Sequence, residues 1–150
     1  MKIAEALQER ADLNRRIEQL RRRLNMNATV QEGEKPAEDP NELVKELDLC
    51  AARLEELMAR INLTNANIKV EGKSLTELIA KRDALTVKLN AYRDLVSGAS
   101  NVVSRATRSE IKILPAVNVK KLQKQVDDMS KELRLTDNAI QQANWMNELL

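Results

Sequence analysis

The stretch LVKELDLCAARLEELMARI, residues 43–61, decides the fold of this chain. Its apolar side chains recur every three or four residues, at Leu43, Leu47, Cys50, Leu54, Leu57 and Ile61. This spacing keeps one stripe of an α-helix turned toward a partner helix, while charged residues occupy the rest of its surface. The pattern therefore predicts a long helix that packs along a single apolar seam.

Three further seams with the same spacing run through the rest of the chain, and almost no apolar residues fall outside them. Their members are Ile3, Ala6, Leu13, Ile17, Leu20 and Leu24; Leu75, Leu78, Leu85, Leu89, Tyr92 and Val96; and Val119, Leu122, Val126, Met129, Leu133 and Ile140. We predict a mostly all-α fold, a bundle of four long antiparallel helices that forms a single domain over residues 1–150. The expected helices cover about 2–26, 40–65, 75–105 and 118–148.

The connections carry helix-start signals and two short extended candidates. Asp39 with Pro40, Ser74 with Glu77, and Asn118 are the expected caps of the last three helices. Gly72 allows a tight reversal of the chain before the third helix. We expect residues 28–32 to pair with residues 110–114 in a short two-stranded β-ribbon between connections.

The composition disfavours several functional classes. The chain has 25 basic and 23 acidic residues, a net charge of +2, so it has no global attraction for nucleic acid or an anionic membrane. It has no histidine and one cysteine, Cys50, which we interpret as a buried apolar residue. We expect no enzymatic activity, no catalytic residue, no cofactor and no metal. Without a signal peptide or an apolar run of about 18 residues, we expect a cytoplasmic protein.

A run of arginines in the first helix has two interpretations. Its members are Arg15, Arg16, Arg21, Arg22 and Arg23. Such a run suits contacts with nucleic-acid phosphates, but it equally suits salt bridges on a solvated helix face. Because no aromatic residue lies nearby to stack a base, salt bridging is the preferred interpretation.

Arg10 and Arg82 are unusual because they occupy positions on apolar seams. A buried arginine needs a paired carboxylate, for which the candidates are Glu46, Asp48, Asp83 and Asp127. Such a pair fixes the register of helices or an oligomer contact. The alternative at Arg82 is a pocket that binds an anion.

Polar residues cluster at the ends of the second and fourth helices, which share one pole in an antiparallel bundle. The candidates are Asn62, Thr64, Asn65, Gln141, Asn144 and Trp145. One interpretation is a hydrogen-bonded end of the bundle. The other is a recognition surface anchored by Trp145, since tryptophan is enriched at interface hot spots.

Several motifs resemble a bacterial family of small helical proteins of unknown function, some of which are labelled septicolysin. They are RINLTN at 60–65, SLTE at 74–77, KRD at 81–83, RSEIK at 108–112 and the ending D137-x-x-I-Q-x-x-N-W-x-x-E-L149. The resemblance implies a homo-oligomer, with a six-membered ring as the best single expectation, and no catalytic residue. Its label implies a pore-forming cytolysin, an alternative that the short extended segments and densely charged helix flanks disfavour.

Apolar residues beside the seams supply a physical reason to expect self-assembly. Val44, Met58, Ile79 and Leu135 lie where one bundle is not expected to cover them. Burying them against another copy is the simplest remedy. We therefore expect an uncharacterised protein with a structural or interaction role through self-assembly, with membrane activity and nucleic-acid or anion binding as alternatives.

Overall fold

The computed structural model describes residues 1–101 and 111–150. Four helices account for most of them: α1 (Ile3–Met26), α2 (Pro40–Asn67), α3 (Leu75–Ser100) and α4 (Val119–Met146). Two short strands, β1 (Lys69–Val70) and β2 (Lys73–Ser74), lie between α2 and α3. The predicted fold class, a mostly α-helical bundle with a small two-stranded sheet, is confirmed. The expected extension of the third helix to residue 105 falls largely outside the described residues.

Each predicted cap is present, which explains where three of the helices begin. Asp39 Oδ1 accepts a hydrogen bond from the Asn41 backbone N–H at 2.9 Å, with Pro40 at the first helical position. At α3, Ser74 Oγ accepts from the Glu77 N–H, and the Glu77 carboxylate accepts from the Ser74 N–H. At the start of α4, Asn118 Oδ1 accepts a hydrogen bond from the Lys121 N–H at 3.0 Å.

The predicted ribbon is wrong in its position. The strands pair at residues 69–74, where Glu71 (φ 50°) and Gly72 (φ 83°) form the two-residue turn of a hairpin. Residues 28–32 and 111–114 form no strand, and residue 110 lies outside the described part. The α1–α2 connection instead satisfies its polar groups locally, since the Glu38 N–H donates to Asn27 Oδ1 and the Glu34 N–H to the Gln31 carbonyl.

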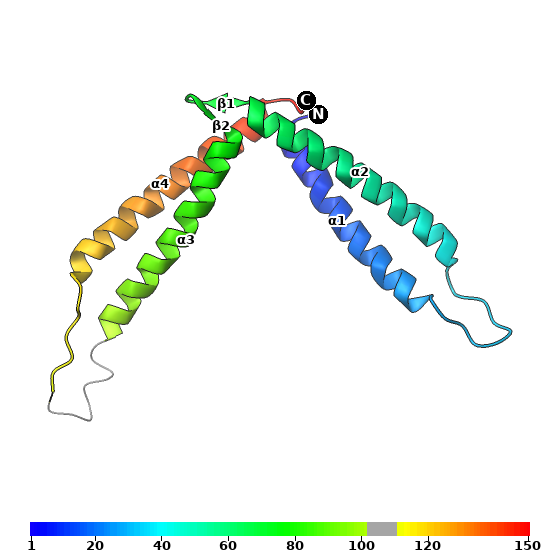
Figure 1. Ribbon diagram of the computed structural model, residues 1–150, viewed down its shortest axis with the longest axis horizontal. Coiled ribbons are helices and arrows are strands. Elements are labelled where there is room, and N and C mark those ends of the chain that lie inside the picture. The colour runs from blue at the N-terminus through cyan, green and yellow to red at the C-terminus, as the bar shows by residue number, and fades with distance from the viewer. Residues whose placement is uncertain (102–110) are drawn as a thin grey trace. The chain divides into compact units, whose positions relative to one another are not determined.

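The described residues divide into two compact units. Residues 1–69 with 143–150 form the α1–α2 unit, and residues 70–142 form the α3–α4 unit. The expectation that residues 1–150 form a single domain stays a prediction. Within each unit the helices lie side by side and run antiparallel (Figure 1). Two ion pairs between α1 and α2 show the antiparallel direction, because Arg16 pairs with Glu46 while Arg53 pairs with Glu9.

The four predicted seams form the inner faces of the helices. Ala6, Leu57, Ile61 and Leu149 make the buried core of the α1–α2 unit, and Leu89, Val126 and Met129 that of the α3–α4 unit. Every seam residue named from the sequence is buried or half-buried, including Cys50. The 3–4 spacing thus identified the packed face of each helix. Burial of the apolar area on these faces stabilises the fold.

The two chain ends close the α1–α2 unit. The α4 helix ends at Met146, two residues earlier than expected, because Lys2 and Glu148 form an antiparallel bridge. The Leu149 N–H donates to the Met1 carbonyl at 2.8 Å, and the Ile3 N–H to the Asn147 carbonyl at 3.2 Å. Residues 147–150 therefore pair with the start of α1 instead of continuing a helix.

Candidate functional site

The polar residues predicted at the end of α2 form part of the closure by the chain ends. Thr64, fully buried, donates from Oγ1 to the Arg60 carbonyl at 2.7 Å and accepts from the Leu150 N–H at 3.0 Å. Arg60 Nε donates to the Leu150 carbonyl at 2.6 Å. These bonds match the hydrogen-bonded helix end that the sequence suggested. Thr64 therefore has a structural role, since its hydroxyl forms hydrogen bonds with two backbone groups, the Arg60 carbonyl and the Leu150 N–H.

The remaining members of the polar cluster are in different surroundings. Asn62 and Gln141 are exposed, and Asn144 is buried. Asn65 is half-buried, and its Oδ1 is the one buried side-chain oxygen or nitrogen in the described ranges without a hydrogen-bond partner. Gln141 belongs to the α3–α4 unit and the others to the α1–α2 unit.

Trp145 is 63% exposed and lines an open groove of about 400 Å³ along α1. The other lining residues are Ala4, Glu5, Gln8, Glu9 and Asp12. The groove is thus acidic on one side and aromatic on the other. The recognition surface at Trp145, one of the two interpretations of this cluster, stays a prediction.

The five arginines of the run in α1, residues 15, 16 and 21–23, all meet carboxylates. Arg15 pairs with Asp12, Arg21 and Arg22 lie 3.5 Å from Glu18, Arg16 pairs with Glu46, and Arg23 Nε donates to Glu38 at 3.0 Å. The Arg23 guanidinium holds the pKa of Glu38 below its ordinary value. The run is therefore a set of salt bridges, as the preferred interpretation had it, and its charge is locally compensated.

Arg10 and Arg82 differ in what they meet. Arg10 is half-buried and makes no ion pair within ranges 1–101 and 111–150, so the carboxylate partner expected for it is missing there. Arg82 is 30% exposed and meets two carboxylates, Asp83 at 2.9 Å and Asp137 at 3.6 Å. Asp83 was among the predicted partners and Asp137 was not.

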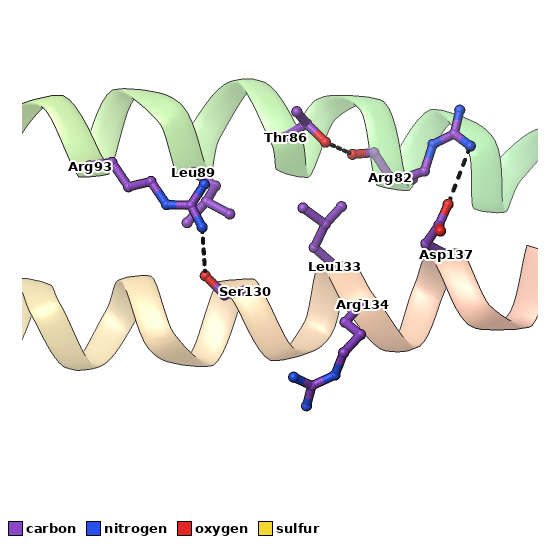
Figure 2. Close-up of a pocket in the computed structure, with 8 residues that line it drawn as sticks. All are labelled: Arg82, Thr86, Leu89, Arg93, Ser130, Leu133, Arg134 and Asp137. Atoms are coloured by element: carbon purple, nitrogen blue, oxygen red, sulfur yellow. Dashed lines mark hydrogen bonds and ion pairs between the residues drawn. The ribbon is translucent and has the colours of Figure 1, made fainter.

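Arg82 lies at one end of a groove of about 370 Å³ between α3 and α4, hereafter the arginine groove (Figure 2). Its lining residues are Arg82, Thr86, Leu89, Arg93, Ser130, Leu133, Arg134 and Asp137. Leu89 is 1% exposed and Leu133 is half-buried, so the floor is apolar. At the other end, Arg93 Nη2 donates to Ser130 Oγ at 3.2 Å.

Arg93 and Ser130 were not singled out from the sequence, although a signal was present. Arg82, Thr86, Leu89 and Arg93 follow one another at spacings of four, three and four residues, which places them along one side of a helix. Arg82 and Leu89 lie on the apolar seam, so the row runs along the edge of the seam and adds Thr86 and Arg93 beside it. Counting polar residues at helical spacing would have found it.

A second row of residues that the sequence analysis missed lies on the other side of α3. Its members, which we call the outer face of α3, are Ala80, Ala84, Val87, Ala91, Leu95 and Gly98. All six are exposed, and Val87 is 71% exposed. They recur every three or four residues, as the seam does. The expectation that apolar residues fall almost only on four seams is therefore wrong for α3, which carries a second apolar row.

No helix within the described residues is both long and apolar enough to cross a membrane. The charged residues that flank each seam are the reason, since they recur within every 18-residue window.

Comparison with known proteins places the chain in an uncharacterised family. The model of a family of unknown function, DUF6847, matches residues 10–149. A crystal structure described as that of a functionally unknown conserved protein from Corynebacterium diphtheriae is 38% identical, covers 100% of this chain and 99% of that one, and has a TM-score of 0.93. No curated protein matches. Neither description carries the septicolysin label, which is therefore not supported. The chain belongs to DUF6847, a family of unknown function.

Proposed function

We propose that this protein acts through protein contact, by assembling with copies of itself through the outer face of α3. The observation that carries the proposal is that α3 is apolar on two faces. Its seam packs against α4 through Leu89, whereas the outer face, centred on Val87, is exposed. An apolar row at helical spacing is the surface by which one helix packs on another.

The small size of the side chains supports a helix partner in particular. Ala80, Ala84 and Ala91 project little from the helix. Small residues let two helix backbones approach closely, so that contact extends to the backbone itself. Leu95 and Gly98 line a groove together with residues 113–117, so we place the contact over residues 80–91.

The charges beside the outer face favour a second copy of α3 in parallel orientation. Asp83 precedes and Lys88 follows the central pair Ala84 and Val87. In a parallel helix pair, a residue on one flank faces the residue five positions later on the partner. Asp83 of each copy then meets Lys88 of the other, whereas an antiparallel pair brings like residues of each flank together.

Other exposed apolar residues can supply further contacts. Val44, Met58 and Leu135 are exposed, as the sequence analysis expected, and Ile79 is half-buried. A contact through α3 alone gives a dimer, with about twice the mass of the 17.0 kDa chain. The six-membered ring implied by the septicolysin resemblance needs a second contact, for which Trp145 and the α2 residues are the candidates.

Light scattering coupled to size exclusion tests the proposal with a matched pair of variants. We expect the native chain to have a defined mass above 17.0 kDa at micromolar concentration. Val87→Glu places two carboxylates in the contact and lowers the mass. Leu49→Glu makes the same change at a residue of α2 that is 73% exposed, and leaves the mass unchanged.

A native mass of one chain at tens of micromolar would overturn self-assembly altogether. If the native chain is oligomeric and Leu49→Glu dissociates it while Val87→Glu does not, the assembly stands and the outer face of α3 is the wrong surface.

A further inference from the structure

We propose that the arginine groove binds a small amphiphile with one anionic head group, with its oxyanion at Arg93 and its apolar body along Leu89 and Leu133. The groove lies within the α3–α4 unit and uses a different side of α3 from the outer face. The inference therefore stands independently of self-assembly.

The first argument is the charge of Arg93. In the part of the chain that the structure describes, Arg93 meets no carboxylate, and its one bond is to the hydroxyl of Ser130. Arg134, which also lines the groove, makes no ion pair there either and extends away from α3 (Figure 2). The run Arg15, Arg16, Arg21, Arg22 and Arg23 in α1, by contrast, is fully paired with carboxylates, and Arg10, which is not, lines neither the Trp145 groove nor the arginine groove. Arg93 is thus the source of uncompensated positive charge at the Ser130 end of the groove.

The second argument is that an uncharged hydroxyl, and not a carboxylate, holds Arg93 in place. Ser130 Oγ donates to the Val126 carbonyl at 2.7 Å and accepts from Arg93, so both of its bonds are defined. A hydroxyl accepts a hydrogen bond but carries no charge. The guanidinium fork therefore keeps N–H donors for an oxyanion, the group that its planar geometry binds best.

The opposite end of the groove sets what the rest of the ligand must be. Arg82 is compensated by Asp83 and Asp137, so this end offers no free positive charge. Asp137 itself lines the groove and repels a second anionic group. Between the ends lie Leu89 and Leu133, which favour an apolar chain. The geometry therefore favours one charged head on an apolar body over a dianion with charge at both ends.

A carboxylate and a phosphate ester share this chemistry, so the probes must separate them. Isothermal titration of the full-length protein compares octanoate, octyl phosphate, octanedioate, octanol and inorganic phosphate at millimolar concentration. We expect one or both of the first two to bind, which identifies the head group. Octanedioate, octanol and inorganic phosphate are expected to bind at least several-fold more weakly.

The variants assign the binding to the groove. Arg93→Gln keeps a polar side chain but removes its charge, and we expect it to weaken binding of the preferred probe about tenfold or more. Arg15→Gln, which removes an exposed arginine of α1, leaves binding unchanged. The mass of Arg93→Gln in solution stays that of the native protein, because Arg93 lies outside the outer face of α3.

Three results would overturn the inference. They are an absence of binding by octanoate and octyl phosphate alike, octanol or inorganic phosphate binding as tightly as the amphiphilic anions, and Arg15→Gln weakening binding as much as Arg93→Gln. None of them bears on self-assembly, which the mass of the native chain tests separately.

Discussion

The two helical hairpins follow the same apolar pattern but treat their polar residues differently. In the α1–α2 unit, ion pairs connect the two helices. Arg53, for example, contacts two carboxylates, Glu9 at 2.7 Å and Glu56 at 2.9 Å. In the α3–α4 unit, Arg93 meets only a hydroxyl, and α3 presents an uncovered apolar face. An apolar seam is enough to build each hairpin, so the residues off the seam are where function can differ.

The largest expected effect tests whether the two cores stabilise their own hairpins. Leu57→Ala and Leu89→Ala each remove a side chain that is at most 1% exposed, and each should cost about 2–5 kcal/mol. Hydrogen exchange should show the greater loss of protection in the hairpin that carries the substitution. Leu49→Ala, at an exposed position, is the control and should cost under about 0.5 kcal/mol. Equal loss of protection in both hairpins would show that they unfold as one unit.

The next largest effect is expected on acidification, which should destabilise the α1–α2 unit before the α3–α4 unit. Arg53 lowers the pKa of Glu9, Arg23 that of Glu38, and Lys2 that of Glu148, all in the α1–α2 unit. Since each folded pKa lies below the ordinary value of about 4.5, the stability that these pairs contribute is present above that pH. It is lost as the pH falls through the folded values.

In the α3–α4 unit the corresponding residue is Glu132, whose pKa is lowered by Lys81. Trp145 reports on the first unit and Tyr92 on the second. On acidification below about pH 4.5, the tryptophan fluorescence should change before the near-ultraviolet tyrosine signal does. Simultaneous changes would contradict the assignment of most pH-sensitive pairs to the α1–α2 unit.

The smallest effect compares one arginine from each hairpin. Arg53→Gln breaks a two-point contact with Glu9 and a contact with Glu56, so Tm should fall by a few degrees. Arg93→Gln removes no ion pair, and Tm should stay the same or rise slightly. Thermal unfolding followed by circular dichroism gives both values. A fall for Arg93→Gln as large as that for Arg53→Gln would mean that Arg93 has a stabilising role.

Sequence reasoning predicted what depends on neighbouring residues and missed what depends on packing. The caps at Asp39, Ser74 and Asn118 are local hydrogen bonds, and the apolar seams are periodic. The helix starts and the packed faces were therefore both predictable from the sequence. The ribbon was misplaced because residues 28–32 have strand-like composition, while the Glu71–Gly72 turn had the better hairpin geometry. Local signals therefore established the helices but not the pairing of connections.

The candidate sites show the same division. Arg82 was predictable because an arginine on an apolar seam stands out, and its partner Asp83 is adjacent in sequence. Asp137 could not be assigned, since the register of α3 against α4 decides which carboxylate it meets. The outer face of α3 was overlooked because alanine and glycine carry little apolar area, although their spacing repeats as regularly as that of the seam.

The most direct test of the central claim is a distance between two copies of α3 in solution. In a Cys50→Ala background, spin labels are placed at Thr76→Cys or Asn90→Cys, which are exposed and lie on the same side of the helix two heptads apart. Pulsed electron paramagnetic resonance then measures the distance between identical sites. Parallel pairing through the outer face predicts short and similar distances at both positions. An antiparallel pair would lengthen the distance at Thr76 by about 10–20 Å relative to Asn90, at 1.5 Å per residue. The absence of a dipolar signal at either site would contradict the claim that the outer faces of α3 meet.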